Sequence, residues 1–153
     1  MSGTHPSIKK VLLIDDDADD VMFFEDALRK VDSSLEVWHF SSAKDMPAAE
    51  HCIPPDLLFL DINMPDINGF EWLKIIREKG HSFPVIMYST ASNPSFVERA
   101  YQEGANVYFP KPDNLRTLQQ SLNCLLNFNW SEPDKVTESF HQNGVYRVFN
   151  LTS

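Results

Sequence analysis

The chain has 153 residues, of which 42% are hydrophobic, 12% aromatic and 23% charged. This composition is typical of one globular domain with a buried core, and it excludes collagenous, disulfide-stapled and wholly disordered chains. Thirteen basic against 22 acidic residues give a formal net charge of −9. That balance argues against a nucleic-acid partner and against binding to an anionic membrane surface.

The cysteines and the N-terminus bear on the compartment. Cys52 and Cys124 lack the spacing of a zinc site, so we expect two buried, reduced thiols. The first seven residues are polar, unlike a secretory signal, and no apolar run approaches the ~20 residues of a membrane span. We therefore expect a cytoplasmic protein with a flexible segment over 1–7.

Five short apolar runs predict β-strands. They lie at 11–14, 35–40, 57–60, 85–88 and 107–109. The first, third and fourth runs are uninterrupted, as in parallel strands that are covered on both faces. Glu36 and His39 interrupt the second run, which favours an edge strand.

Apolar residues at steps of three and four predict a helix after each of these runs. The clear stripes lie at 21–31, 70–76, 97–101 and 115–125, and a weaker helix that contains Pro47 is expected over 42–51. Asn93 followed by Pro94 has the pattern of a helix cap and a first helical residue. Asp113 is a candidate cap for the last of these helices.

Alternation of strand and helix predicts an α/β fold with a doubly wound parallel sheet. In such sheets the carboxyl ends of the strands meet at one edge, where ligands bind. The residues that follow the apolar runs are chemically distinctive: Asp15, Asp16 and Asp17, then Asp61, then Ser89 and Thr90, then Lys111. We therefore expect carboxylates, a hydroxyl and an ammonium group to converge at this edge.

This set of groups suits phosphoryl chemistry. Asp15, Asp16 and Asp61 would repel one another unless a hard divalent cation such as Mg²⁺ binds between them. A carboxylate can attack phosphorus to form an acyl phosphate, and Lys111 would then neutralise the phosphoryl oxygens. Ser89 could donate a hydrogen bond to the same group once it has formed.

Each residue also has an ordinary explanation when taken alone. The acidic run 15–20 could be a solvated helix start, since acidic residues favour helix N-termini. Asp61 could be a loop or cap residue, Lys111 a solvated lysine and Ser89 a polar strand end. Their coincidence after four different strands favours a common site.

Four blocks of the sequence resemble the receiver domains of two-component response regulators. The blocks are Val11–Asp17 (VLLIDDD), Asp61–Arg77 (DINMPDINGFEWLKIIR), Pro84–Ala91 (PVIMYSTA) and Gly104–Pro112 (GANVYFPKP). The resemblance covers about residues 8–127. It implies a flavodoxin-like sheet with strand order 2-1-3-4-5 and helices on both faces, and a division into a receiver domain over 8–128 and a C-terminal extension over 129–153.

The resemblance also implies roles for the residues of the edge. Asp61 matches the phosphoacceptor, and Asp15, Asp16, Asp61 and the main-chain carbonyl of Asn63 match the ligands of Mg²⁺ or Mn²⁺. Ser89 and Lys111 match the residues that bind the phosphoryl group.

Further positions match the switch and the loops of the family. Ser89 and Tyr108 match the switch pair, in which the aromatic ring rotates inward. Pro65 and Gly69 shape the loop after the phosphoacceptor, and Asn68–Gly69 is expected to need permissive backbone angles there. The bond between Lys111 and Pro112 is expected to be cis, so that it aims the lysine into the site.

The implied function is a phosphorylation-gated switch rather than a classical enzyme. A histidine kinase or a histidine phosphotransfer protein would phosphorylate Asp61, and a downstream protein would read the surface built from the helix with the stripe 97–101, the strand at 107–109 and parts of 113–127. Val97, Tyr101, Asn106 and Tyr108 are expected on that surface. A weak homodimer is a further option.

Departures from the family keep alternatives open. Thr90 stands where a small residue is usual, which leaves room for a phosphorylation-silent pseudo-receiver that only binds proteins. Asp15-x-Asp17 loosely resembles haloacid-dehalogenase-like phosphatases, although Asp61 is then unexplained. A phosphorelay intermediate would differ only in its downstream partner.

The extension after residue 128 is too short for an output domain. Its strand-like run, Val145–Phe149, could pair with a sheet edge or a dimer partner, or the extension could be disordered.

Overall fold

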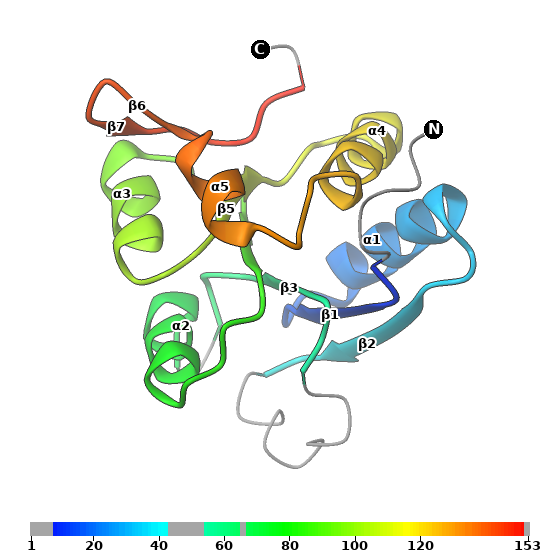
Figure 1. The fold of residues 1–153 in the computed structure, drawn as a ribbon. Coiled ribbons are helices and arrows are strands. Elements are labelled where there is room, and N and C mark those ends of the chain that lie inside the picture. Colours follow the sequence, from blue (N-terminus) through cyan, green and yellow to red (C-terminus); the bar gives the residue numbers. More distant parts are fainter. Residues whose placement is uncertain (1–7, 43–53, 65–66, 152–153) are drawn as a thin grey trace.

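The computed structural model describes residues 8–42, 54–64 and 67–151. Within these ranges the chain forms a parallel five-stranded sheet in the order β2-β1-β3-β4-β5 (Figure 1). The strands are β1 (Lys10–Ile14), β2 (Glu36–Phe40), β3 (Leu57–Leu60), β4 (Val85–Ser89) and β5 (Val107–Pro110). The predicted doubly wound α/β fold and its strand order are therefore confirmed.

Helices cover both faces of this sheet. They are α1 (Ala18–Val31), α2 (Gly69–Glu78), α3 (Pro94–Gln102) and α4 (Leu115–Leu126). Helices α1 and α4 lie on one face, and α2 and α3 lie on the other (Figure 1). The weaker helix expected over 42–51, and the segment 1–7, fall on residues outside the described ranges.

The alternating side chains of β1 explain why both faces need helices. Leu12 and Ile14 belong to the apolar cluster under α2 and α3, whereas Val11 and Leu13 belong to the cluster under α1 and α4. All four side chains are fully buried. Successive side chains of a strand point to opposite faces, so an uninterrupted apolar run can be satisfied only when both faces are covered.

Helix caps define how the chain enters each helix. Asn93 precedes α3 and Pro94 is its first residue, as expected. The cap of α4 is Asn114 rather than Asp113, because the Asn114 side chain accepts a hydrogen bond from the Thr117 amide at 2.8 Å. Asp17 caps α1 by accepting hydrogen bonds from the amides of Asp19 and Asp20. The Asp17 carboxylate is therefore engaged in a local structural contact.

After α4 the chain turns back over the sheet. It forms the short helix α5 (Pro133–Glu138) and the hairpin strands β6 (His141–Gln142) and β7 (Val145–Tyr146). Figure 1 shows these elements next to α3 and β5. The strand-like run expected over 145–149 is thus shorter than predicted, and beyond Tyr146 the chain continues without regular structure.

The structure bears on the expectations about the cysteines and about a membrane-spanning segment. Cys124 is free but exposed, so the prediction that it is buried is wrong. It lies on the outer side of α4, whose apolar stripe points to α1 and the sheet. Cys52 lies outside the described residues. Among the described residues no helix is long and apolar enough to cross a membrane, and the cytoplasmic location stays a prediction.

Candidate functional site at the carboxyl edge of the sheet

The predicted site residues meet at the carboxyl ends of β1, β3, β4 and β5. Main-chain bonds extend the ladder by one residue beyond the strands: the Asp61 amide donates to the Ile14 carbonyl at 2.9 Å, and the Lys111 amide donates to the Ser89 carbonyl at 2.8 Å. The relative positions of these side chains are therefore held by the sheet itself.

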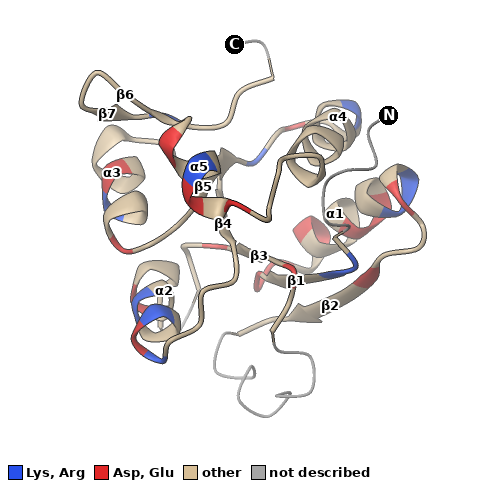
Figure 2. Cartoon of the chain, in the orientation of Figure 1, with Lys and Arg blue, Asp and Glu red and all other residues tan. Residues whose placement is uncertain are grey.

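Three carboxylates gather at this edge. Asp15 is fully buried, Asp61 is 5% exposed, and Asp16 is exposed to solvent. One carboxylate oxygen from each lies within 4.8 Å of the others. Acidic residues mark the start of α1 beside them (Figure 2). A set of hard oxygen donors with one side open to water fits Mg²⁺ or Mn²⁺.

Lys111 reaches across the edge to these carboxylates. Its Nζ lies 2.8 Å from Asp15 Oδ2, 2.7 Å from Asp20 Oδ2 and 3.7 Å from Asp61 Oδ1. Burial lowers the pKa of Lys111, but its bonds to Asp15 and Asp20 outweigh burial and leave the pKa above its usual value. The ammonium group is therefore charged and stands beside Asp61.

The environment of Asp61 disfavours its ionised form. Burial raises the pKa of Asp61 to about 7; Lys111 acts against this rise, and the neighbouring Asp15 adds to it. A carboxyl that must act as a nucleophile needs its charge. Full ionisation of Asp61 near neutral pH thus requires more positive charge beside it. A cation bound by the adjacent carboxylates would supply that charge.

Asp20 also lies at this edge, whereas the sequence predicts it only as one member of the acidic run 15–20. It lies in the first turn of α1, three residues after the cap Asp17, and its carboxylate is the shortest contact of Lys111. The position of an acidic residue one helical turn after the carboxylates was the available signal. The sequence does not show whether Asp19 or Asp20 contacts Lys111, because that depends on the orientation of α1 relative to the sheet.

Gly69 is needed for close approach rather than for its backbone angles. Its φ is not positive, unlike that of Gly80, Gly104 and Gly144, so the expectation of permissive angles is wrong. A Cβ built on Gly69 would lie 2.2 Å from the Asp61 carbonyl oxygen and 2.8 Å from Ile62 Cα. The Gly69 amide donates to the Ile62 carbonyl at 2.8 Å. This bond holds the start of α2 against residues 61–64, called here the site loop. Pro65 lies outside the described residues.

The predicted switch pair lies beside the site. Ser89 is fully buried at the end of β4, and its Oγ accepts a hydrogen bond from the Ala91 amide at 3.2 Å. The Tyr108 ring is also fully buried, and its hydroxyl donates to the Ala91 carbonyl at 2.7 Å. Thr90, between them in sequence, is exposed. Asn63 follows Asp61 on the exposed side of the loop, and its role as a ligand stays a prediction.

The surface expected to bind a partner is covered. Val97, Tyr101, Asn106 and Tyr108 are each 7% exposed or less. Residues 129–151 lie over α3 and β5 (Figure 1) and contribute to this burial: the Tyr101 hydroxyl donates to the Arg147 carbonyl, and Asn106 Nδ2 donates to Thr137 Oγ1. The sequence expectation of an open face is therefore wrong for these four residues, because apolar side chains of the chain's own C-terminal segment pack onto them.

Comparison with known proteins agrees with this geometry. The family model of the response regulator receiver domain matches residues 11–123. The DNA-binding transcriptional regulator NtrC of Proteus hauseri is 30% identical over 94% of this chain, and the match spans 33% of NtrC. The chain thus spans about a third of the length of that relative.

Solved structures share the fold. The phosphorylated cyanobacterial phytochrome response regulator RcpA has a TM-score of 0.70 and 28% identity, covering 82% of this chain and 95% of its own. The Mn²⁺-bound form of response regulator Rcp1 has a TM-score of 0.69 and 24% identity, covering 80% and 94%. With the matched model, the strand order and the clustered carboxylates, this chain belongs to the response regulator receiver domain family.

Proposed function

We propose that this chain is a phosphorylation-gated receiver in which Asp61 accepts a phosphoryl group from a histidine kinase or a histidine phosphotransfer protein. The observation that carries the proposal is the arrangement around Asp61. Its carboxylate shares a 4.8 Å cluster with Asp15 and Asp16, and Lys111 Nζ lies 3.7 Å from its Oδ1. A buried nucleophile beside a cation site and an ammonium group is suited to phosphoryl transfer.

The transfer is a displacement at phosphorus. An Asp61 carboxylate oxygen forms the new P–O bond while the P–N bond of the donor phosphohistidine breaks, and its electron pair stays on the imidazole nitrogen, which then takes up a proton. Asp15, Asp16 and Asp61 would hold Mg²⁺ or Mn²⁺, which neutralises charge on the phosphoryl oxygens when bound. The Mn²⁺-bound form of Rcp1, a protein of the same fold, supports this choice of ion.

Lys111 and Ser89 then bind the product. The Lys111 ammonium turns from its partners Asp15 and Asp20 toward a phosphoryl oxygen, which is a stronger anion than either carboxylate. The Ser89 hydroxyl, which accepts from the Ala91 amide, turns to donate to a second phosphoryl oxygen, and this turn alters its contact with residue 91. Because Tyr108 is bonded to the Ala91 carbonyl, the movement of this loop reaches β5.

The phosphatase alternative finds less support in the structure. Asp15, which would be its nucleophile, is fully buried and paired with Lys111. Asp17, the second acidic residue of that motif, is engaged as the cap of α1. Receiver domains are signalling modules rather than classical enzymes, in agreement with the family match.

The test is the intact mass of the protein after incubation with Mg²⁺ and phosphoramidate or acetyl phosphate. We expect one phosphoryl adduct on the native chain and none on Asp61→Asn or in a chelator. Asp19→Asn, which alters an exposed acidic residue in the first turn of α1, serves as the control and should label normally. Absence of an adduct with both donors, in folded protein, would contradict the proposal and favour a phosphorylation-silent interaction module.

A further inference from the structure

Residues 129–151, called here the C-terminal extension, are bonded directly to the strand that carries the switch tyrosine. The Phe149 amide donates to the Tyr108 carbonyl at 2.7 Å. The Tyr101 hydroxyl donates to the Arg147 carbonyl at 2.7 Å and accepts from the Tyr108 amide at 3.1 Å. Both main-chain polar groups of Tyr108 are therefore linked to the extension, one directly and one through Tyr101.

Side chains anchor the extension at both of its ends. Near its start, Trp130 is 7% exposed and its Nε1 donates to the Leu125 carbonyl at 2.8 Å. Near its end, Phe149 is 7% exposed and meets Phe109 edge to face at 5.6 Å between ring centroids. Between these points the Asn106 Nδ2 donates to Thr137 Oγ1 at 3.1 Å. The extension thus packs against the receiver domain along its length and forms a cover over β5.

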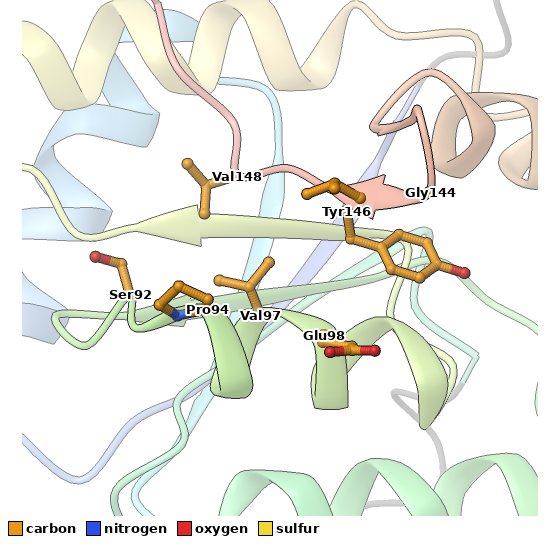
Figure 3. Close-up of a pocket in the computed structure, with 8 residues that line it drawn as sticks. Ser92, Pro94, Val97, Glu98, Gly144, Tyr146 and Val148 are labelled. Atoms are coloured by element: carbon orange, nitrogen blue, oxygen red, sulfur yellow. The ribbon is translucent and has the colours of Figure 1, made fainter.

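The cover is less complete over α3. Tyr146 stacks on Tyr101 with ring centroids 4.6 Å apart. Figure 3 shows Val97 of α3 and Val148 of the extension on opposite sides of a crevice, with the Tyr146 hydroxyl pointing away from it. The crevice holds about 350 Å³. The extension therefore packs less completely against α3 at this point.

The position of Tyr108 depends on this cover. Its ring lies fully buried in the apolar cluster against which Tyr146, Val148 and Phe140 pack, and its hydroxyl is held by the Ala91 carbonyl. Outward rotation of the ring would therefore disturb its packing with these three side chains. A docked extension thus favours the inward position of Tyr108.

We infer that the C-terminal extension is a clamp that holds Tyr108 in its inward position and is thermodynamically coupled to the phosphorylation of Asp61. The inference rests on the proposed function, because it requires that phosphorylation favours inward Tyr108. Two events that favour the same conformation must favour each other by equal factors. Phosphorylation then tightens the extension, and the surface offered to a partner is formed by the extension together with α3, rather than by an exposed β5.

Trypsin cleavage after Arg147 reports directly on the clamp. The Arg147 side chain is exposed, but its amide donates to the Phe140 carbonyl at 2.7 Å and its carbonyl accepts from Tyr101. Cleavage therefore requires the extension to leave the sheet. The full chain would be digested with and without Mg²⁺ and beryllofluoride, a phosphoryl analogue, and the fragments would be followed by mass. Cleavage after Arg29, in α1, is the internal control.

We expect beryllofluoride to slow cleavage after Arg147 by at least threefold and to leave cleavage after Arg29 unchanged. Asp61→Asn should abolish this response. Faster cleavage after Arg147, or an unchanged rate when titration shows that beryllofluoride is bound, would overturn the clamp while leaving the proposed function intact. Failure of the native chain to bind beryllofluoride and to form a phosphoryl adduct would overturn the proposed function and the clamp with it.

The reciprocal test loosens the clamp and measures the site. Tyr101→Phe removes both hydroxyl contacts, and Tyr146→Ala removes the ring that stacks on Tyr101; Tyr146→Phe is the matched control. Both test variants should speed cleavage after Arg147 and weaken beryllofluoride binding, measured by calorimetric titration, by a factor similar to the protection seen in the native chain. Loosened variants that keep native beryllofluoride affinity would contradict the coupling.

Discussion

The acidic edge of the sheet and the covered face of β5 differ in how their interactions affect stability. At the edge, Asp15 and Asp61 are buried carboxylates whose proximity to one another is unfavourable, and Lys111 compensates only in part. On the face, Trp130 and Phe149 bury aromatic surface, and hydrogen bonds satisfy the main chain of Tyr108. The edge therefore costs stability, as a site of the proposed reactivity can, whereas the face contributes stability.

Removal of the Trp130 side chain should give the largest loss of stability. The ring is buried against α4 and its Nε1 bonds Leu125, so Trp130→Ala should lower the free energy of unfolding by about 3–5 kcal/mol. Urea denaturation followed by circular dichroism measures the change. Val145→Ala, at an exposed position of the same extension, should change it by less than about 0.5 kcal/mol. A loss of stability in Trp130→Ala as small as that in Val145→Ala would show that the extension does not unfold together with the core.

Asp61→Asn should act in the opposite direction, because it relieves the edge. A carboxyl whose pKa is about 7 when folded and 3.8 when exposed binds more protons in the folded state, so stability falls as pH rises from about 4 to 7. In a chelator the variant should lack this loss and exceed the native chain by roughly 2–4 kcal/mol at pH 8.

The measurement for Asp61→Asn is urea unfolding at pH 4 and pH 8. Mg²⁺ should stabilise the native chain at pH 8 more than the variant, since the variant lacks one carboxylate of the cluster. Asp16→Asn, at an exposed position of the same carboxylate cluster, is the matched control. A native chain whose stability does not fall between these pH values would contradict the assigned pKa of Asp61.

Gly69→Ala should disturb the edge by sterics alone. The added Cβ would lie 2.2 Å from the Asp61 carbonyl oxygen, so the start of α2 or the site loop must shift, at a cost of about 1–3 kcal/mol. Phosphorylation by phosphoramidate should slow at the same time, because the shifted carbonyl belongs to Asp61, the proposed phosphoacceptor. Glu71→Ala, exposed in the first turn of the same helix, is the control. Native stability and native rate in Gly69→Ala would contradict this account.

Asp20→Asn should have the smallest effect on stability and a visible effect on rate. It breaks one partly exposed ion pair with Lys111, which is worth about 0.5–1 kcal/mol. Lys111 is then freer to approach Asp61, so the initial rate of phosphorylation should rise a few-fold. Asp19→Asn, at an exposed position in the same helix turn, should match the native rate. A slower Asp20→Asn would show that Asp20 positions the lysine productively.

The strands and most helices were accessible from the sequence because burial on both faces leaves a direct pattern. The apolar runs at 11–14 and 57–60 became β1 and β3, and the stripe at 115–125 became α4. The positions of Asp61, Ser89 and Lys111 followed from the same reasoning, since residues after parallel strands must meet at one edge. The cap of α4 was misplaced by one residue, because neighbouring Asp113 and Asn114 have equal capping chemistry.

What the sequence determined by itself was the order of the elements and the chemistry at the end of each strand, because periodicity and residue type are local properties. Only the tertiary structure decided that Asp20 is bonded to Lys111, that Gly69 lies against the Asp61 main chain, and that residues 129–151 cover Tyr108. These contacts join residues far apart in the chain or depend on the direction of a helix. They are set by the packing of whole elements, which no local pattern encodes.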